Sequence, residues 1–187
     1  MEITATAIPG VLLLAAPRAV DERGFFSETF RRSWMEERSL PAEWVQDNHS
    51  LSRQKGTVRG LHFQVPPRRQ AKLIRVVAGS VFDVVVDLRR ASPAFGRHVA
   101  FELSAAAGFQ VLVPAGCAHG FCTLEPDTEV LYKVSDYYSP EHDRGLRWDD
   151  PALGIAWPVT AAAAVLSDRD RQHPPLAELP DYFSEGA

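Results

Sequence analysis

The chain has 187 residues, of which 45% are apolar, and it carries 20 Lys and Arg against 24 Asp and Glu. This composition suits one globular domain over residues 1–187 and excludes collagen-like, coiled-coil and low-complexity chains. No apolar run approaches the roughly 20 residues of a membrane-spanning helix, and the N-terminal segment lacks the positive charge of a secretory leader, so we expect a cytoplasmic protein with no membrane partner. The two cysteines, Cys117 and Cys122, are too few for a disulfide scaffold or a cysteine-only zinc site, and we expect them to be buried thiols.

The predicted elements begin with a helix near Arg31–Arg38, which Pro41 ends. Short segments rich in Val, Ile and Phe follow at roughly ten-residue intervals between Gly, Pro or Ser residues, and we predict that they are strands. They are Lys72–Val77, Ser80–Leu88, Val99–Leu103, Phe109–Val113 and Glu129–Val134. A second short helix is predicted at Pro175–Leu179. This spacing is typical of an antiparallel sandwich or barrel, so the expected fold class is all-β with a few short peripheral helices.

Basic residues concentrate in residues 48–82, which hold seven Lys or Arg and no Asp or Glu, whereas the rest of the chain holds 13 basic against 24 acidic residues. A positive segment in an otherwise acidic chain predicts a cleft that attracts an anionic ligand, with a solvated basic face as the alternative. A nucleic-acid partner is not expected, because the net charge is −4 and the basic residues lie among strand-like runs.

Two spaced motifs resemble those of the cupin superfamily of double-sheet jelly rolls. The first motif is matched by five residues, Gly56, His62, Gln64, Lys72 and Gly79, and the second by four, Gly108, Pro114, Gly116 and His119. Metal-binding cupins resemble one another in placing three histidines and a glutamate around the ion, whereas Gln64 and Lys72 stand at two of those positions here. An amide is a poor transition-metal ligand and an ammonium group repels a divalent cation, so we expect a jelly roll without metal.

A narrower resemblance rests on six further segments. They are Asp21–Glu28, Gln46–Asn48, Lys55–Gln64, Pro114–Phe121, Tyr132–Glu141 and Arg144–Pro151. With them the chain closely resembles the dTDP-4-dehydrorhamnose 3,5-epimerase family from about residue 10 to residue 170. The resemblance implies epimerisation of a dTDP-linked 4-keto-6-deoxyhexose, dTDP-4-dehydro-6-deoxy-D-glucose, at carbons 3 and 5. It implies that dTDP-4-dehydro-L-rhamnose forms without a cofactor, in dTDP-L-rhamnose biosynthesis.

Inversion of a carbon next to a ketone requires a base, a cation for the enolate oxygen and an acid on the opposite face. The resemblance implies that His62 is the base, Lys72 the enolate stabiliser and Tyr132 the acid. It nominates Asp170 as the carboxylate that orients the base, with Asp168 as the nearby alternative. Without the surrounding motifs, a histidine, lysine or tyrosine in a strand is more often structural.

The resemblance also implies a set of substrate-binding residues. They are Arg23, Phe26, Glu28, Gln46, Asp47, Asn48, Arg59, His119, Tyr138, Asp143 and Arg169. Arg59 and Arg23 suit the diphosphate, because a guanidinium fork matches phosphate oxygens. We expect Arg23 to come from the neighbouring subunit of a homodimer that exchanges N-terminal strands. Phe26 and Tyr138 offer flat faces for thymine.

Three members of this set differ from the family pattern or have an alternative role. Asp143 and Arg169 stand where relatives often have Glu and Lys, which keeps the charge but changes the contact geometry. His119 has an alternative as a core histidine paired with Asp83, an acid on a predicted strand that is apolar on both faces and therefore needs a partner.

Three other functions remain open at this stage. One is a close variant that inverts only one carbon of a related nucleotide 4-keto sugar. Another is a metal-dependent cupin enzyme that uses His62 and His119. The third is a nucleotide-sugar-binding module without catalysis.

Overall fold

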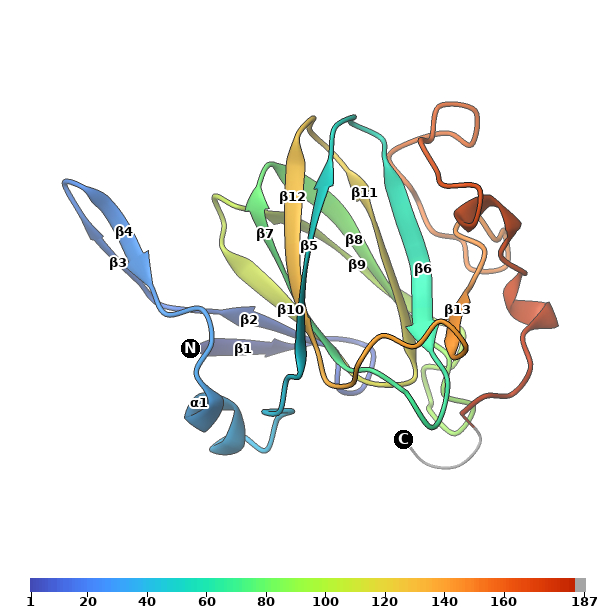
Figure 1. The fold of residues 1–187 in the computed structure, drawn as a ribbon, viewed down its shortest axis with the longest axis horizontal. Helices are drawn as coiled ribbons and strands as arrows, with labels where there is room; N and C mark the ends of the chain where they lie inside the picture. Colours follow the sequence, from blue (N-terminus) through green and yellow to red (C-terminus); the bar gives the residue numbers. More distant parts are fainter. Residues whose placement is uncertain (184–187) are drawn as a thin grey trace.

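The computed structural model describes residues 1–183, so residues 184–187 of the predicted domain lie outside the described part (Figure 1). Its strands are β1 (Glu2–Ala5), β2 (Leu12–Ala15), β3 (Arg18–Asp21), β4 (Gly24–Ser27), β5 (Gln46–Ser52), β6 (Val58–Gln64), β7 (Lys72–Ala78), β8 (Ser80–Asp87), β9 (His98–Ser104), β10 (Phe109–Val113), β11 (Cys117–Thr123), β12 (Thr128–Val134) and β13 (Asp143–Gly145). The helical elements are α1 (Arg32–Glu36) and the 3-10 helices η1 (Asp170–Gln172) and η2 (Leu176–Glu178).

Two antiparallel sheets face each other across the core. One has six strands in the order β1-β2-β10-β7-β12-β5, and the other has five in the order β13-β6-β11-β8-β9. Strands β3 and β4 form a separate hairpin that extends away from both sheets (Figure 1). This arrangement confirms the predicted all-β double-sheet jelly roll. Within residues 1–183, no helix is long and apolar enough to span a membrane.

The five predicted strands are present as β7, β8, β9, β10 and β12, with ends that differ by a residue at most. The predicted helix near Arg31–Arg38 is shorter, at Arg32–Glu36, and the one at Pro175–Leu179 is the 3-10 helix η2. Strands β6 and β11 were not among the predicted strands, because they contain Gly, His and Cys where β-branched residues would give a clear signal.

The apolar faces of the two sheets bury a common core. Ile74, Val85 and Val111, from three different strands, are each 0% exposed and belong to one cluster. Cys117 and Cys122 are buried as predicted, and burial raises the pKa of their thiols to about 12 and about 11. Both thiols are therefore protonated and weakly nucleophilic at neutral pH.

Strands β6 and β11 approach unusually closely at Gly60. This residue has a φ of +122°, and a Cβ on it would lie 2.6 Å from the Cα of Gly120 and 2.8 Å from the carbonyl oxygen of His119. Glycine is needed here both for its conformation and for the space. The close approach brings His62 opposite His119 in the register of the two strands.

Candidate active site

A cavity of about 460 Å³ opens between the two sheets. It is lined by Ser50, Thr57, Val58, Arg59, His62, Lys72, His119, Phe121, Tyr132, Val165, Leu166, Ser167, Arg169 and Asp170. All four predicted catalytic residues therefore share one cavity, although they come from parts of the chain that are far apart in sequence. Of the seven basic residues in 48–82, only Arg59 and Lys72 are in this lining, so the expected basic cleft has fewer cations than the segment offers.

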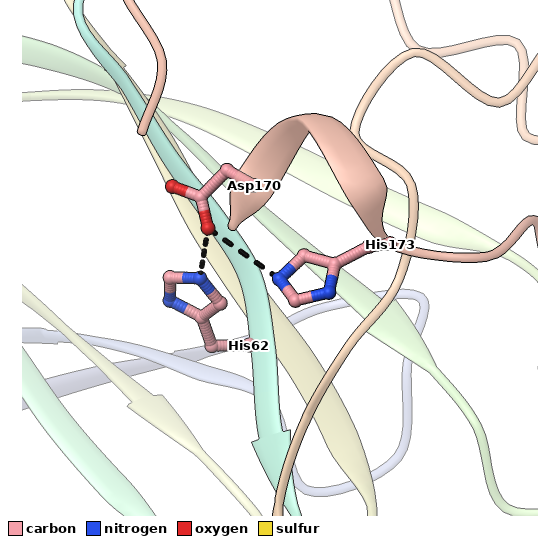
Figure 2. A group of neighbouring side chains, drawn as sticks. All are labelled: His62, Asp170 and His173. Atoms are coloured by element: carbon pink, nitrogen blue, oxygen red, sulfur yellow. Dashed lines mark hydrogen bonds and ion pairs between the residues drawn. The ribbon is translucent and has the colours of Figure 1, made fainter. Parts of the chain in front are cut away.

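His62 and Asp170 form a hydrogen-bonded pair in the cavity wall. His62 Nε2 lies 2.6 Å from Asp170 Oδ1, and the Asp170 side chain is only 6% exposed (Figure 2). The backbone nitrogen of Asp170 in turn donates to Ser167 Oγ at 3.1 Å, which fixes the start of η1. Asp168, the sequence alternative, is exposed. The structure thus pairs His62 with Asp170.

In each member of this pair, the effect of burial on the pKa is opposed by the interaction with neighbouring side chains. Burial lowers the pKa of His62, while the hydrogen bond and the charge of Asp170 act in the opposite direction. Burial also disfavours ionisation of Asp170, but the interactions with His173 and His62 outweigh it and lower the pKa of that carboxyl group. At neutral pH the pair therefore consists of a carboxylate and a neutral imidazole.

Lys72 is buried at the start of β7, in the opposite sheet. Its side chain donates from Nζ to the carbonyl oxygen of His62 at 3.0 Å. Burial lowers its pKa to about 8, against the opposing effects of the carboxylates of Asp143 and Asp83. The ammonium group therefore remains mostly charged at neutral pH and is held beside the candidate base.

Tyr132 lines the same cavity from β12, in the same sheet as Lys72. Burial raises the pKa of its phenol, although Arg59 partly opposes this. The phenol therefore keeps its proton at neutral pH. A neutral imidazole on one sheet and a protonated phenol on the other are the two groups that a proton transfer across the cavity needs.

His119 is both a buried core residue and a cavity residue. Its Nε2 lies 2.8 Å from Asp83 Oδ2, and the exposed fractions of the two side chains are 9% and 0%. Asp83 thus has the partner that its burial requires, and the alternative interpretation of His119 is confirmed. The same ring still lines the cavity, so the two interpretations are compatible.

Arg59 and Arg169 are two further predicted binding residues that line the cavity. Arg59 donates to Ser52 Oγ and to the carbonyl oxygen of Leu51, both at 3.0 Å, which ties β6 to the edge strand β5. Arg169, another cavity residue, forms an ion pair with Asp143 at 2.6 Å.

A second set of these residues is linked outside the cavity lining. Gln46 accepts a hydrogen bond from the backbone of Tyr138 at 3.0 Å and donates to Asn48 at 2.8 Å. Asp47 pairs with Lys133 at 2.9 Å. Asp47 and Asn48 line a separate hollow on the six-stranded sheet.

Three predicted binding residues lie away from the cavity of their own chain. Arg23 sits at the turn of the β3–β4 hairpin, pairs with Asp21 and has a side chain that is 84% exposed. Phe26 is 74% exposed, and Glu28 pairs with Arg31. One chain therefore does not bring these residues to His62, and their predicted contribution to a neighbouring subunit remains a prediction.

His173 is a neighbour of the candidate base that the sequence did not single out. Its Nε2 lies 3.4 Å from Asp170 Oδ1, and its ring stands edge-on to His62 with centroids 5.6 Å apart (Figure 2). A signal existed, because residues three apart in a 3-10 helix lie on one side. That signal depends on recognising η1 at Asp170.

The possible metal-ligand atoms of His62, Asp170 and His173 lie within 4.8 Å of one another, which is close enough for a shared cation. The His62 Nε2 to Asp170 Oδ1 distance of 2.6 Å is a hydrogen-bond length. A metal with bonds of about 2.0 to 2.2 Å would hold such atoms further apart and displace the shared proton. The arrangement suits a proton-sharing pair and does not suit a metal.

Comparisons with known proteins identify the family of this chain. A family model described as dTDP-4-dehydrorhamnose 3,5-epimerase matches residues 5–178. A Sinorhizobium fredii protein of that name is 51% identical over 183 residues, which cover 98% of this chain and 93% of the relative. The fold and site together define a jelly-roll epimerase.

Two solved structures extend the match to the fold. The Bacillus anthracis dTDP-4-dehydrorhamnose 3,5-epimerase, solved with TDP and PPi, is 46% identical with a TM-score of 0.90 and covers 93% of this chain and 98% of that one. The Legionella pneumophila dTDP-6-deoxy-D-glucose-3,5-epimerase, in complex with dTDP-4-keto-L-rhamnose, is 39% identical with a TM-score of 0.93 and covers 100% and 99%. The chain belongs to the dTDP-4-dehydrorhamnose 3,5-epimerase family, as its motifs predicted.

Proposed function

We propose that this protein converts dTDP-4-dehydro-6-deoxy-D-glucose into dTDP-4-dehydro-L-rhamnose by inverting carbons 3 and 5, as a step of dTDP-L-rhamnose biosynthesis. The observation that carries the proposal is the cavity in which the His62–Asp170 pair on one side faces Tyr132 and Lys72 on the other. Several relatives are named as 3,5-epimerases, which favours inversion of two carbons over inversion of one.

In the proposed mechanism, His62 removes the C–H proton next to the ketone. The electron pair of that bond forms a carbon–carbon double bond, and the carbonyl electrons move to the oxygen. The Lys72 ammonium group stabilises this enolate oxygen, which carries full charge only after proton removal, so its effect is largest at the transition state. Asp170 stabilises the imidazolium form of His62 while it holds the proton.

Tyr132 completes each inversion from the opposite face. Its phenol donates a proton to the same carbon, the double bond is lost and the carbonyl returns. Because base and acid come from different sheets, removal and return of the proton occur on opposite faces of the ring. The same pair then acts on the second carbon after its protons re-equilibrate with solvent.

The nucleotide end is proposed to involve both subunits of a homodimer. Arg59 and Arg169 lie at the cavity of one subunit, where guanidinium groups suit phosphate oxygens. The β3–β4 hairpin of the partner is proposed to bring Arg23 to the phosphates and Phe26 to the thymine. The exposure of this hairpin supports the proposal, since Val20, Phe25 and Phe26 are 77%, 61% and 74% exposed.

The reaction is tested by incubation with dTDP-4-keto-6-deoxyglucose in deuterated water. We expect deuterium at both C3 and C5 and a product of L-rhamno configuration, with the same rate after treatment with a chelator. The label at each carbon is read by NMR. Label at one carbon would identify a single-carbon epimerase, loss of activity on chelation would favour a metal enzyme, and no label at either carbon would refute the proposal.

A further inference from the structure

His173 is a buried histidine beside the candidate base, and the mechanism above gives it no role. Its side chain is 10% exposed, and Nε2 has no hydrogen-bond partner within residues 1–183. That nitrogen lies 3.4 Å from Asp170 Oδ1, the same oxygen that His62 Nε2 contacts at 2.6 Å. Figure 2 shows the two imidazoles converging on one carboxylate oxygen. A buried polar atom without a full partner is uncommon and suggests a functional constraint.

The chain leaves space for the His173 ring at Gly145. This glycine pairs with His62 in the register of β13 and β6, and a Cβ on it would overlap the His173 ring. Gly145 is not among the glycines with positive φ, so its backbone conformation does not require glycine. Glycine is required at this position because a side chain would occupy the space of the His173 ring.

The position of His173 is fixed by the chain on both sides of it. The 3-10 helix η1 places it three residues after Asp170, and the next carbonyl, that of Pro174, accepts a hydrogen bond from the backbone nitrogen of Arg147 at 2.8 Å. The planes of the His173 and His62 rings meet at 83°. The imidazole is therefore held against the pair by its own backbone.

We propose that His173 is a positioning residue for the base: it holds the Asp170 carboxylate in place and shares oxygen Oδ1 with His62, which limits how strongly Asp170 retains a proton on His62. The inference rests on the proposed function and deepens it. A carboxylate oxygen that also contacts a second imidazole nitrogen, here at 3.4 Å, stabilises the His62 imidazolium less than it would if it faced His62 alone. The consequence is a base that stays neutral, and so ready to accept a proton, at a lower pH.

Other ionisable groups also face His62, and the test has to leave them unchanged. They are Arg59 on β6, Lys72 on β7, His119 on β11, Tyr132 on β12, Asp143 on β13, and Arg169 and Asp170 at the start of η1. Because a substitution at His173 keeps all of them, a changed titration of His62 reports on His173 itself.

The test compares two substitutions of His173 in the full chain. His173→Phe keeps a flat ring but removes the N–H group, whereas His173→Gln keeps an N–H donor at similar reach. The pKa of His62 is measured by NMR titration of its imidazole signals in the ligand-free protein, assigned with His62→Asn. We expect that pKa to rise by about 0.5 to 1 unit in His173→Phe and to stay near the wild-type value in His173→Gln. The acid limb of kcat/KM should move with it.

Two results would overturn the inference. An unchanged titration in His173→Phe would mean that the ring only fills space, and equal shifts in both variants would mean that the N–H group plays no part. Because this readout needs no turnover, it is separate from the proposed function, which fails only if the wild-type protein gives no label exchange.

A second measurement covers the case in which His173→Phe does not fold. Gly145→Ala should raise the pKa of His62 in the same direction, because it displaces the His173 ring, but should change that pKa little when His173→Ala has already removed the ring. Independent effects of the two substitutions would contradict the proposed use of the space at Gly145.

Discussion

At the scale of single residues, the site depends on charged side chains that are buried away from solvent. Lys72 is only 7% exposed, and this burial lowers the pKa of its ammonium group, although Nζ donates a hydrogen bond to the backbone beside the base. The residues of this site were predicted through the family resemblance of the motifs that contain them. The link between His173 and Asp170 was not predictable, since it depends on a 3-10 turn that has no strong sequence signal.

The lowered pKa of Lys72 predicts an alkaline limit to activity. Because the proposed enolate is stabilised only by the charged ammonium group, kcat should fall as the pH rises through about 8. Because the pKa of the Tyr132 phenol is raised from its usual value, loss of activity through Tyr132 ionisation should occur at higher pH. Lys72→Arg keeps a charge throughout this range and should lose the limb near pH 8, at a lower kcat.

The check is the pH profile of kcat for both proteins, with Lys72→Met as the control. That variant should lose about 10²- to 10³-fold in kcat below pH 8, where wild-type Lys72 is charged, and should show no limb near pH 8. A limb near pH 8 that persists in Lys72→Arg would assign it to another group.

At the scale of elements, predictability followed side-chain chemistry. Strands such as β8 and β10 are rich in Val, Leu and Phe and were recognised, while β6 and β11 carry the histidines and glycines of the site and were not. On these two strands, the positions that carry the site residues cannot also carry residues of high strand propensity. Gly60 is an example, because it has low strand propensity but permits the close approach of β6 and β11.

Gly60→Ala should destabilise the fold by about 2 to 4 kcal/mol, because the new Cβ meets two backbone atoms that have no room to move. The measurement is the free energy of unfolding in urea. Gly24→Ala is the matched control, since Gly24 has a similar φ of +127° but nothing within 4 Å of its Cβ position. Equal losses in both variants would show that backbone strain, and not the contact between β6 and β11, sets the cost.

At the scale of the whole molecule, the all-β class followed from the spacing of apolar segments, and the two-sheet architecture followed from the family resemblance. Composition alone could not predict which strands pair in each sheet, because strand pairing depends on contacts between residues far apart in sequence. The placement of Arg23 and Phe26 on an extended hairpin makes the subunit arrangement the main prediction at this scale.

Subunit mixing tests that arrangement. If the hairpin crosses to the partner, Arg23→Ala and His62→Asn should each be nearly inactive. An equal mixture should regain about a quarter of the wild-type sites, because about half of the dimers are mixed and each mixed dimer has one intact site. Activity is measured after the two variants are unfolded and refolded together, with each variant refolded alone as the control. Recovery no greater than the controls, or a monomer in sedimentation, would contradict hairpin exchange.

Because His62 and Tyr132 lie on separate sheets, the hydrophobic core also determines the distance between them. The side chains packed between the sheets, among them Ile74 and Val85, set the gap across which a proton must be taken and returned. A core substitution that adds or removes a methylene group in this layer would thus alter turnover without touching any polar atom. The packed interior therefore acts as a spacer between the base and the acid.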